Sequence, residues 1–265
     1  MILIKKIKKF FKIIGPGVIT GAADDDPSGI ATYTQAGAKF GYSQLWLMIC
    51  TLPLLTAVQE ACARIGAVTG KGIAAVIKEY YSKKVLFSAV ILILVANTIN
   101  IGADIGAMAE AAQLLIPINF SVLALFFTAL ILILEIFLSY KTYSNVLKWC
   151  ALSLIAYPVT VFLINNPWLE IFKATFIPHI EFSFGFLFII VGVLGTTISP
   201  YMFFWGASEE VEEEKKHHMF NKGKPKVSEK FMHNLRLDNF FGMLFSQITA
   251  WCIIIVAGTV LHNNG

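Results

Sequence analysis

The chain has 265 residues, of which 57% are hydrophobic and 14% are charged, and its mean hydropathy is +0.70. A soluble domain of this length carries about 25% charged residues, so the composition excludes a water-soluble domain and indicates a membrane protein with several spans. The formal net charge is +4, and we interpret the basic residues as a signal for membrane topology. The charge therefore gives no reason to expect nucleic-acid binding.

The sequence contains seven hydrophobic segments, each close to the roughly 20 residues that a bilayer requires. A basic lead, residues 1–12, precedes them; it is either an amphipathic segment at the cytosolic face or a charge cluster that sets the topology. We therefore expect a single all-α transmembrane domain over residues 1–265. The predicted spans are 13–38, 43–66, 85–113, 120–140, 147–164, 184–213 and 238–261.

The basic residues are unevenly divided between the two sides of the predicted membrane. With seven spans, every Lys and Arg except Lys39 and Lys173 falls on the side of the N-terminus. Basic loops stay in the cytosol. We therefore expect an integral protein of a prokaryotic plasma membrane, with a cytosolic N-terminus and an external C-terminus.

The first and sixth segments cannot continue as plain helices. The first contains Asp24-Asp25-Asp26 followed by Pro27, and the sixth contains Pro200 among small and hydroxyl residues. One Asp at the centre of a membrane helix costs roughly 2.5–3.5 kcal/mol, so the acidic cluster requires a bound cation, a water-filled cavity or a counter-charge. Interrupted spans at matching places in two halves of a chain predict a transport site near the bilayer midplane.

The motifs at these breaks resemble a known family. Asp26-Pro27-Ser28-Gly29 resembles the first span of the NRAMP (natural resistance-associated macrophage protein) divalent-metal transporters, where that family carries Asp-Pro-Gly-Asn. Asp104 falls where the family has an acid in the third span, and the resemblance covers nearly the whole chain. It implies a leucine-transporter-like inverted-repeat fold of about seven transmembrane helices with helices 1 and 6 broken. Residues 13–164 would form the first repeat and residues 184–261 an incomplete second repeat.

The resemblance also implies roles for single residues. Asp26 takes the place of the metal-binding aspartate, and Gly29 takes that of an asparagine ligand. Ser199 takes the place of a methionine ligand, and Thr196 falls where the family offers a backbone carbonyl. Tyr201 stands where the family has a histidine associated with proton movement, which puts proton coupling in doubt.

The remaining acids are open to more than one interpretation. Asp25 is expected to line the vestibule or to hold water around the ion, and Asp24 to be protonated or paired with a donor elsewhere in the bundle. Asp104 attracts cations, relays protons or makes a structural hydrogen bond. The acidic run at residues 209–214 is interpreted as a solvated helix end or as a region that draws or releases cations.

The ion preference follows from the donor chemistry. A thioether favours transition metals, whereas the Ser199 hydroxyl is a hard donor, and Gly29 and Ser199 leave more room than Asn and Met. Magnesium keeps several waters and needs only one or two carboxylates. We therefore expect a transporter of Mg²⁺, with Mn²⁺ as a further substrate, that works by alternating access and has no cofactor other than the transported ion.

Three other functions remain open from the sequence. They are an ordinary NRAMP-type Mn²⁺/Fe²⁺ proton symporter, a sodium-coupled transporter of organic solutes, and a non-transporting fragment or subunit. An enzyme is not expected, because the sequence shows no nucleophile–base set and no HExxH pattern. The family resemblance implies at least three further spans, so we expect a truncated chain or a separate chain that supplies the missing helices. The expected partners are therefore the metal ion, the lipid bilayer and such a chain.

Overall fold

The computed structural model describes residues 20–21, 23–138, 142, 152–216, 220–221, 224–225 and 227–262. The predicted basic lead at 1–12, the start of the first span at 13–19 and the start of the fifth span at 147–151 lie outside the described residues. A short antiparallel hairpin joins β1 (Phe220–Asn221) to β2 (Lys224–Pro225). The other described elements are helices, as the composition predicts.

Five helical stretches within the described residues are long and apolar enough to cross a membrane. They are α4 (Trp46–Thr69), α6 (Lys83–Gln113), α7 (Phe120–Phe137), α11 (Phe184–Thr197) together with α12 (Pro200–Lys216), and α13 (Glu229–Val260). The other two predicted spans appear as shorter helices. The first is α3 (Pro27–Phe40), and the second combines η1 (Leu152–Ile155) with α9 (Ala156–Leu163).

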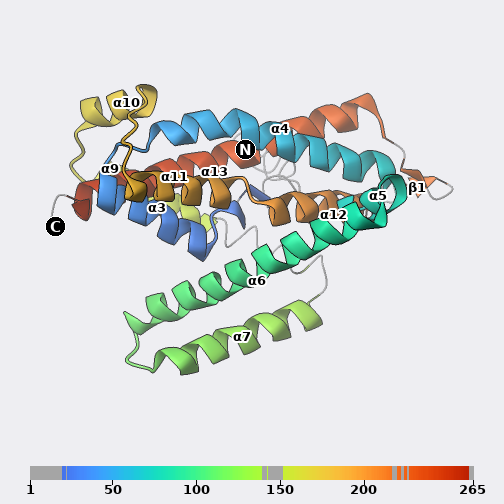
Figure 1. Ribbon diagram of the computed structural model, residues 1–265, viewed down its shortest axis with the longest axis horizontal. Helices are drawn as coiled ribbons and strands as arrows, with labels where there is room; N and C mark the ends of the chain where they lie inside the picture. Colours follow the sequence, from blue (N-terminus) through green and yellow to red (C-terminus); the bar gives the residue numbers. More distant parts are fainter. Residues whose placement is uncertain are drawn as a thin grey trace, which may run out of the picture.

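The helices form a bundle in which α13 lies along both α3 and α4 (Figure 1). On its other sides α3 contacts α11 and α6, and α4 contacts α12. The hairpin of α6 and α7 lies at the edge of the bundle, where α6 contacts α3, α5 and α12. The first and sixth predicted spans are therefore neighbours at the centre of the structure. The division into repeats at 13–164 and 184–261 stays a prediction.

Two short helices and one helix start were not predicted. The short helices α5 (Ile73–Tyr80) and α10 (Trp168–Phe176) lie in loops between predicted spans. Helix α13 begins at Glu229, well before the predicted start at 238, because the Ser228 hydroxyl accepts a hydrogen bond from the Phe231 backbone N–H at 3.2 Å and caps the helix. Hydropathy detects only the apolar part of a helix, so it misses a polar first turn.

Glycines allow the backbones of the central helices to contact each other directly. A Cβ atom on Gly37 of α3 would lie 2.4 Å from the Ile254 carbonyl oxygen of α13. A Cβ atom on Gly66 of α4 would lie 2.3 Å from the Ala207 carbonyl oxygen of α12. Small residues at such crossings let membrane helices pack closely. The Gly37 contact fixes how closely α3 packs on α13, and the Gly66 contact does the same for α4 and α12.

Candidate metal site at the two helix breaks

The first break lies at Asp25 and Asp26, directly before α3. Ala23 and Asp24 are helical, whereas Asp26 is extended, with φ −70° and ψ 167°. The Asp26 Oδ1 atom accepts hydrogen bonds from the Gly29 backbone N–H at 2.6 Å and from the Ser28 hydroxyl at 2.9 Å. Asp26 is therefore the N-cap of α3, and Pro27, which has no N–H to satisfy, occupies the first helical position.

The second break separates α11 from α12. Helix α11 ends at Thr197, Ile198 has φ −108° and ψ 64°, and Pro200 begins α12. The last turn of a helix carries carbonyl groups that the helix itself cannot satisfy, and the C-terminus carries partial negative charge. The end of α11 is therefore suited to receive a cation. The side chain of Tyr201 lies outside the part of the chain that the structure describes.

The structure brings the two breaks together. A Cβ atom on Gly29 would lie 3.1 Å from Asp26 Oδ1 and 3.1 Å from the Thr196 hydroxyl oxygen. The Tyr33 hydroxyl of α3 and the Thr197 hydroxyl of α11 are hydrogen-bonded at 2.9 Å. Three of the residues that the sequence singled out, Asp26, Gly29 and Thr196, thus lie around one point although they come from the first and sixth spans.

Several polar side chains near the breaks are buried without a hydrogen-bond partner in the described structure. They include the Thr196 hydroxyl, the Ser199 hydroxyl and both carboxylate oxygens of Asp25. Ser199 is 2% exposed and Asp25 is 5% exposed. Ser246 and Thr249 of α13 lie beside the Asp25 carboxylate. Buried polar atoms are almost always paired in folded proteins, so these oxygens mark places where an ion or its water could bind.

Asp24 points in a different direction from Asp26. It is fully buried, and its Oδ2 atom accepts a hydrogen bond from the Ser246 hydroxyl of α13 at 2.7 Å. Of the two arrangements that the sequence left open for Asp24, the structure contains the pairing with a donor elsewhere in the bundle. The three consecutive aspartates therefore do not converge on one point.

Helix α6 contributes two residues to the first break. Asp104 Oδ1 accepts a hydrogen bond from the Ser28 backbone N–H at 2.9 Å. The Asn100 amide group donates to Asp26 Oδ2 at 3.0 Å and to Asp104 Oδ2 at 3.1 Å. The sequence by itself does not point to Asn100 as a site residue. The signal available was its position four residues before Asp104, on the same face of a membrane helix.

The acids at the end of α12 differ from the sequence expectation. The sequence predicts either a solvated helix end or a cation-attracting region at residues 209–214, but Glu209, Glu210 and Glu214 are at most 4% exposed. Glu209 accepts a hydrogen bond from the Thr20 hydroxyl at 3.1 Å. The reason is tertiary, because α12 packs along α4 and turns one face of this acidic run into the bundle.

The side-chain donors described at the breaks are oxygen atoms. In the part of the chain that the structure describes, no three His, Cys, Asp or Glu side chains converge to hold a metal ion by themselves. A cation between the breaks would therefore rely on one or two carboxylates supplemented by hydroxyl, carbonyl and water oxygens. Magnesium accepts such sets, and manganese also binds oxygen ligands.

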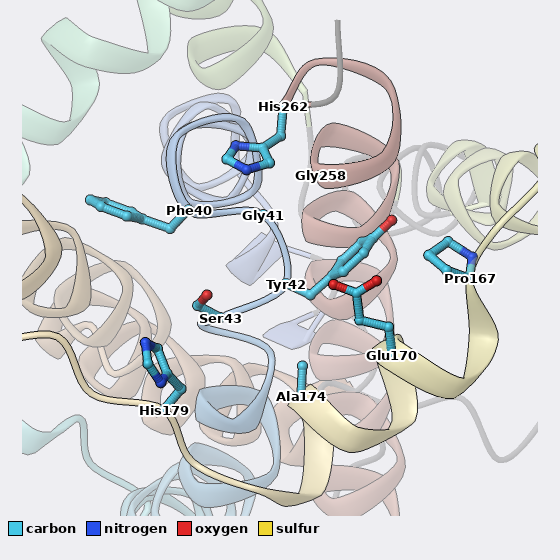
Figure 2. Close-up of a pocket in the computed structure, with 10 residues that line it drawn as sticks. All are labelled: Phe40, Gly41, Tyr42, Ser43, Pro167, Glu170, Ala174, His179, Gly258 and His262. Atoms are coloured by element: carbon cyan, nitrogen blue, oxygen red, sulfur yellow. The ribbon is translucent and has the colours of Figure 1, made fainter. Parts of the chain in front are cut away.

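A separate pocket of about 320 Å³ lies at the end of the bundle that carries the C-terminus (Figure 2). It is formed by the turn after α3, by α10 and by the end of α13. Figure 2 shows His179 and His262 on different sides of the pocket, with the Glu170 carboxylate beside Tyr42. None of the predicted site residues lines it, so the candidate metal site is the pair of helix breaks.

Comparisons with known proteins agree on one family. The divalent metal cation transporters MntH of Listeria welshimeri and Listeria monocytogenes are 25% identical over 272 residues, covering 98% of this chain and 58% of each relative. The MntH of Staphylococcus aureus is 26% identical over 203 residues, covering 73% of this chain and 44% of the relative. The chain thus spans about half the length of the curated relatives that it matches.

A solved structure shows the same fold. The crystal structure of an Eremococcus coleocola manganese transporter mutant superimposes with a TM-score of 0.70 at 18% sequence identity, covering 92% of this chain and 50% of that chain. The predicted fold class, an all-α membrane bundle of the leucine-transporter-like type with broken helices, is therefore confirmed. Residues 17–265 also match the family model described as natural resistance-associated macrophage protein-like. Because that match covers nearly the whole sequence, this chain belongs to the Nramp family.

Proposed function

We propose that this chain forms the ion-binding part of a divalent metal cation transporter, with the ion held between the breaks before α3 and α12. The observation that carries the proposal is that Asp26, Gly29 and Thr196 lie together where two membrane helices are broken. The buried Thr196 and Ser199 hydroxyls there have no hydrogen-bond partner among the described residues. The names of the relatives, which are divalent metal cation transporters and a manganese transporter, support the same class. We propose no enzymatic activity and no cofactor apart from the transported ion.

Each residue predicted to bind the metal has a role in this proposal. Asp26 supplies the carboxylate ligand, and Gly29 leaves room for the ion beside the Thr196 hydroxyl. The end of α11 supplies carbonyl oxygen, and Ser199 supplies a hard hydroxyl. Asp25 holds water around the ion. Because the helices are interrupted at Pro27 and Pro200, each half-helix can tilt separately, which is the movement that alternating access requires.

The proposed preference is Mg²⁺, with Mn²⁺ as a second substrate. The oxygen donors at the breaks support Mg²⁺, because no soft sulfur ligand stands at residue 199. The name of the Eremococcus coleocola protein supports Mn²⁺ as a substrate. That name also favours a second candidate function, an ordinary NRAMP-type Mn²⁺/Fe²⁺ proton symporter. Against this second function, the chain has Ser199 and Tyr201 where such symporters have a methionine and a histidine.

Calorimetric titration of the purified chain with Mg²⁺, Mn²⁺ and Ca²⁺ tests this function. We expect saturable binding of Mg²⁺ and Mn²⁺ to one site, with each ion displacing the other. If the purified chain binds neither Mg²⁺ nor Mn²⁺, the proposal is contradicted and a non-transporting fragment or subunit is favoured. Saturable uptake into liposomes would separately test whether the chain transports without a partner chain.

Replacing Ser199 with Met is expected to shift the ion preference toward manganese. A thioether binds transition metals better than it binds magnesium, so the ratio of the Mg²⁺ and Mn²⁺ dissociation constants should move by about tenfold. Competition titrations on wild type and variant measure this ratio. Replacing the exposed Ser208 of α12 with Met, away from the breaks, is the matched control and should leave the ratio unchanged. An unchanged ratio in the Ser199→Met variant would refute the hard-donor argument.

We propose that the end of the bundle with α5 and β1 faces the cytosol. Lys78, Lys83 and Lys84 lie at that end, whereas α10 with Lys173 lies at the end that carries the C-terminus (Figure 1). The positive-inside rule supports this orientation. A membrane-impermeant lysine reagent applied to intact cells should label Lys173 and leave Lys84 unmodified; the reverse pattern would invert the topology.

A further inference from the structure

Asn100 of α6 connects the proposed ion ligand to a second carboxylate. Its amide nitrogen donates to Asp26 Oδ2 at 3.0 Å and to Asp104 Oδ2 at 3.1 Å. Asp26 and Asp104 come from different helices, and a single NH₂ group bridges them. Both carboxylates repel each other when ionised, and the partial positive charge of the amide hydrogens lies between them. An amide in this place does part of what a cation would do.

The Ser28 hydroxyl makes this arrangement adaptable. Its oxygen lies 2.9 Å from Asp26 Oδ1 and 3.0 Å from Asn100 Oδ1, and both are acceptors. A hydroxyl carries one proton, so Ser28 can serve only one of these acceptors at a time. When a cation takes Asp26 Oδ1, the Ser28 proton can turn to Asn100. The network can therefore accept an ion without leaving the Asn100 carbonyl unsatisfied.

At least three donors among the described residues bind the Asp26 carboxylate. The Gly29 backbone N–H and the Ser28 hydroxyl belong to the same turn as Asp26, and they would form in any capped helix. The Asn100 amide is different because it comes from α6. It holds the Asp26 carboxylate relative to another helix, and together with the Ser28 backbone N–H it holds Asp104 beside the site.

We propose that Asn100 is a positioning residue that sets the ion affinity of this site by holding the Asp26 carboxylate toward the ion and keeping Asp104 beside it. The proposal rests on the proposed function, since it concerns the same ion. Asn100 is not a ligand in this proposal. It acts through Asp26, and its amide compensates two carboxylates while the ion is absent.

Two substitutions of similar size separate positioning from a structural role. Asn100→Leu removes all hydrogen bonds, so Asp26 is no longer held from α6. We expect the dissociation constants of Mg²⁺ and Mn²⁺ to rise by about tenfold or more, the usual consequence of losing a hydrogen bond to a charged group. Asn100→Asp replaces the donor with a third carboxylate. We expect a lower melting temperature without metal but a larger rise in melting temperature on adding Mn²⁺, because a cation relieves the repulsion among the carboxylates.

The metal binding of the Leu variant is the distinguishing result. If Asn100 had only a structural role, both variants would melt lower without metal, and the folded Leu variant would bind Mg²⁺ and Mn²⁺ as the wild type does. The measurements are calorimetric titration with Mg²⁺ and Mn²⁺, and thermal melting with and without Mn²⁺. If the Leu variant does not fold, Asn100→Ser, which removes the amide without adding bulk, replaces it with the same expectation of weaker binding.

Asn97→Leu is the matched control. Asn97 lies on α6 about one turn before Asn100, is half-buried, and has no contact with Asp26 in the described hydrogen bonds. We expect this variant to bind Mg²⁺ and Mn²⁺ like the wild type. Wild-type affinity in the Leu or Ser variant of Asn100, or a smaller Mn²⁺ response in the Asp variant, overturns the inference while the proposed function stands. A wild type that binds neither ion overturns the proposed function and this inference with it.

Discussion

Replacing Asp26 with Asn is expected to weaken the binding of Mg²⁺ and Mn²⁺ by roughly 30- to 4,000-fold. Removing one partner of a buried charge pair costs about 2–5 kcal/mol of binding free energy. Asn is nearly as good an N-cap as Asp, so α3 should still begin at Pro27 and the fold should persist. The weaker metal binding can then be attributed to the missing carboxylate charge, because helix α3 remains intact. Calorimetric titration of both proteins measures the change.

The control for this prediction is the removal of a carboxylate elsewhere. Glu170 lies on α10 in the separate pocket at the other end of the bundle, and it is exposed. Glu170→Gln removes the same charge and should leave both dissociation constants unchanged. If Asp26→Asn binds Mg²⁺ and Mn²⁺ as the wild type does, Asp26 is not the ligand and the site has been assigned to the wrong residues.

Replacing Gly37 with Val is expected to destabilise the protein by about 3 kcal/mol, the upper part of the range for an overpacked core. The added Cβ atom would lie 2.4 Å from the Ile254 carbonyl oxygen and 2.9 Å from the Gly258 backbone nitrogen. Both neighbours are backbone atoms, so the clash can be relieved only if α3 and α13 move apart. Thermal melting in detergent should show a clearly lower transition temperature.

Gly106→Val is the matched control for this prediction. Gly106 lies on α6, and apart from its own helix backbone no described residue lies within 4 Å of the Cβ atom that the substitution adds. This variant should melt within a degree or two of the wild type, since substitutions without a clash change stability by about 0.5 kcal/mol or less. Equal melting of the Gly37 and Gly106 variants would mean that the close approach of α3 to α13 does not contribute to stability.

The sequence alone predicted the membrane class, most of the spans and both helix breaks, because each of these has a local physical cause. A run of apolar residues is stable in a bilayer regardless of what surrounds it. Pro27 and Pro200 interrupt a helix through their own missing N–H groups, and Asp26 caps α3 through atoms three residues away. The family resemblance then indicated which of these residues to assign to a site.

Only the tertiary structure decided which polar groups meet. Asn100 reaches Asp26 across 74 residues of sequence, and Ser246 reaches Asp24 across 222 residues. No periodicity within one helix reports such pairs, since they depend on how helices cross and on which faces they turn to one another. The burial of Glu209 and Glu214 has the same origin, because the packing of α12 decides it. The sequence thus determined where the chain breaks and which residues are available there, and packing determined which of them face each other.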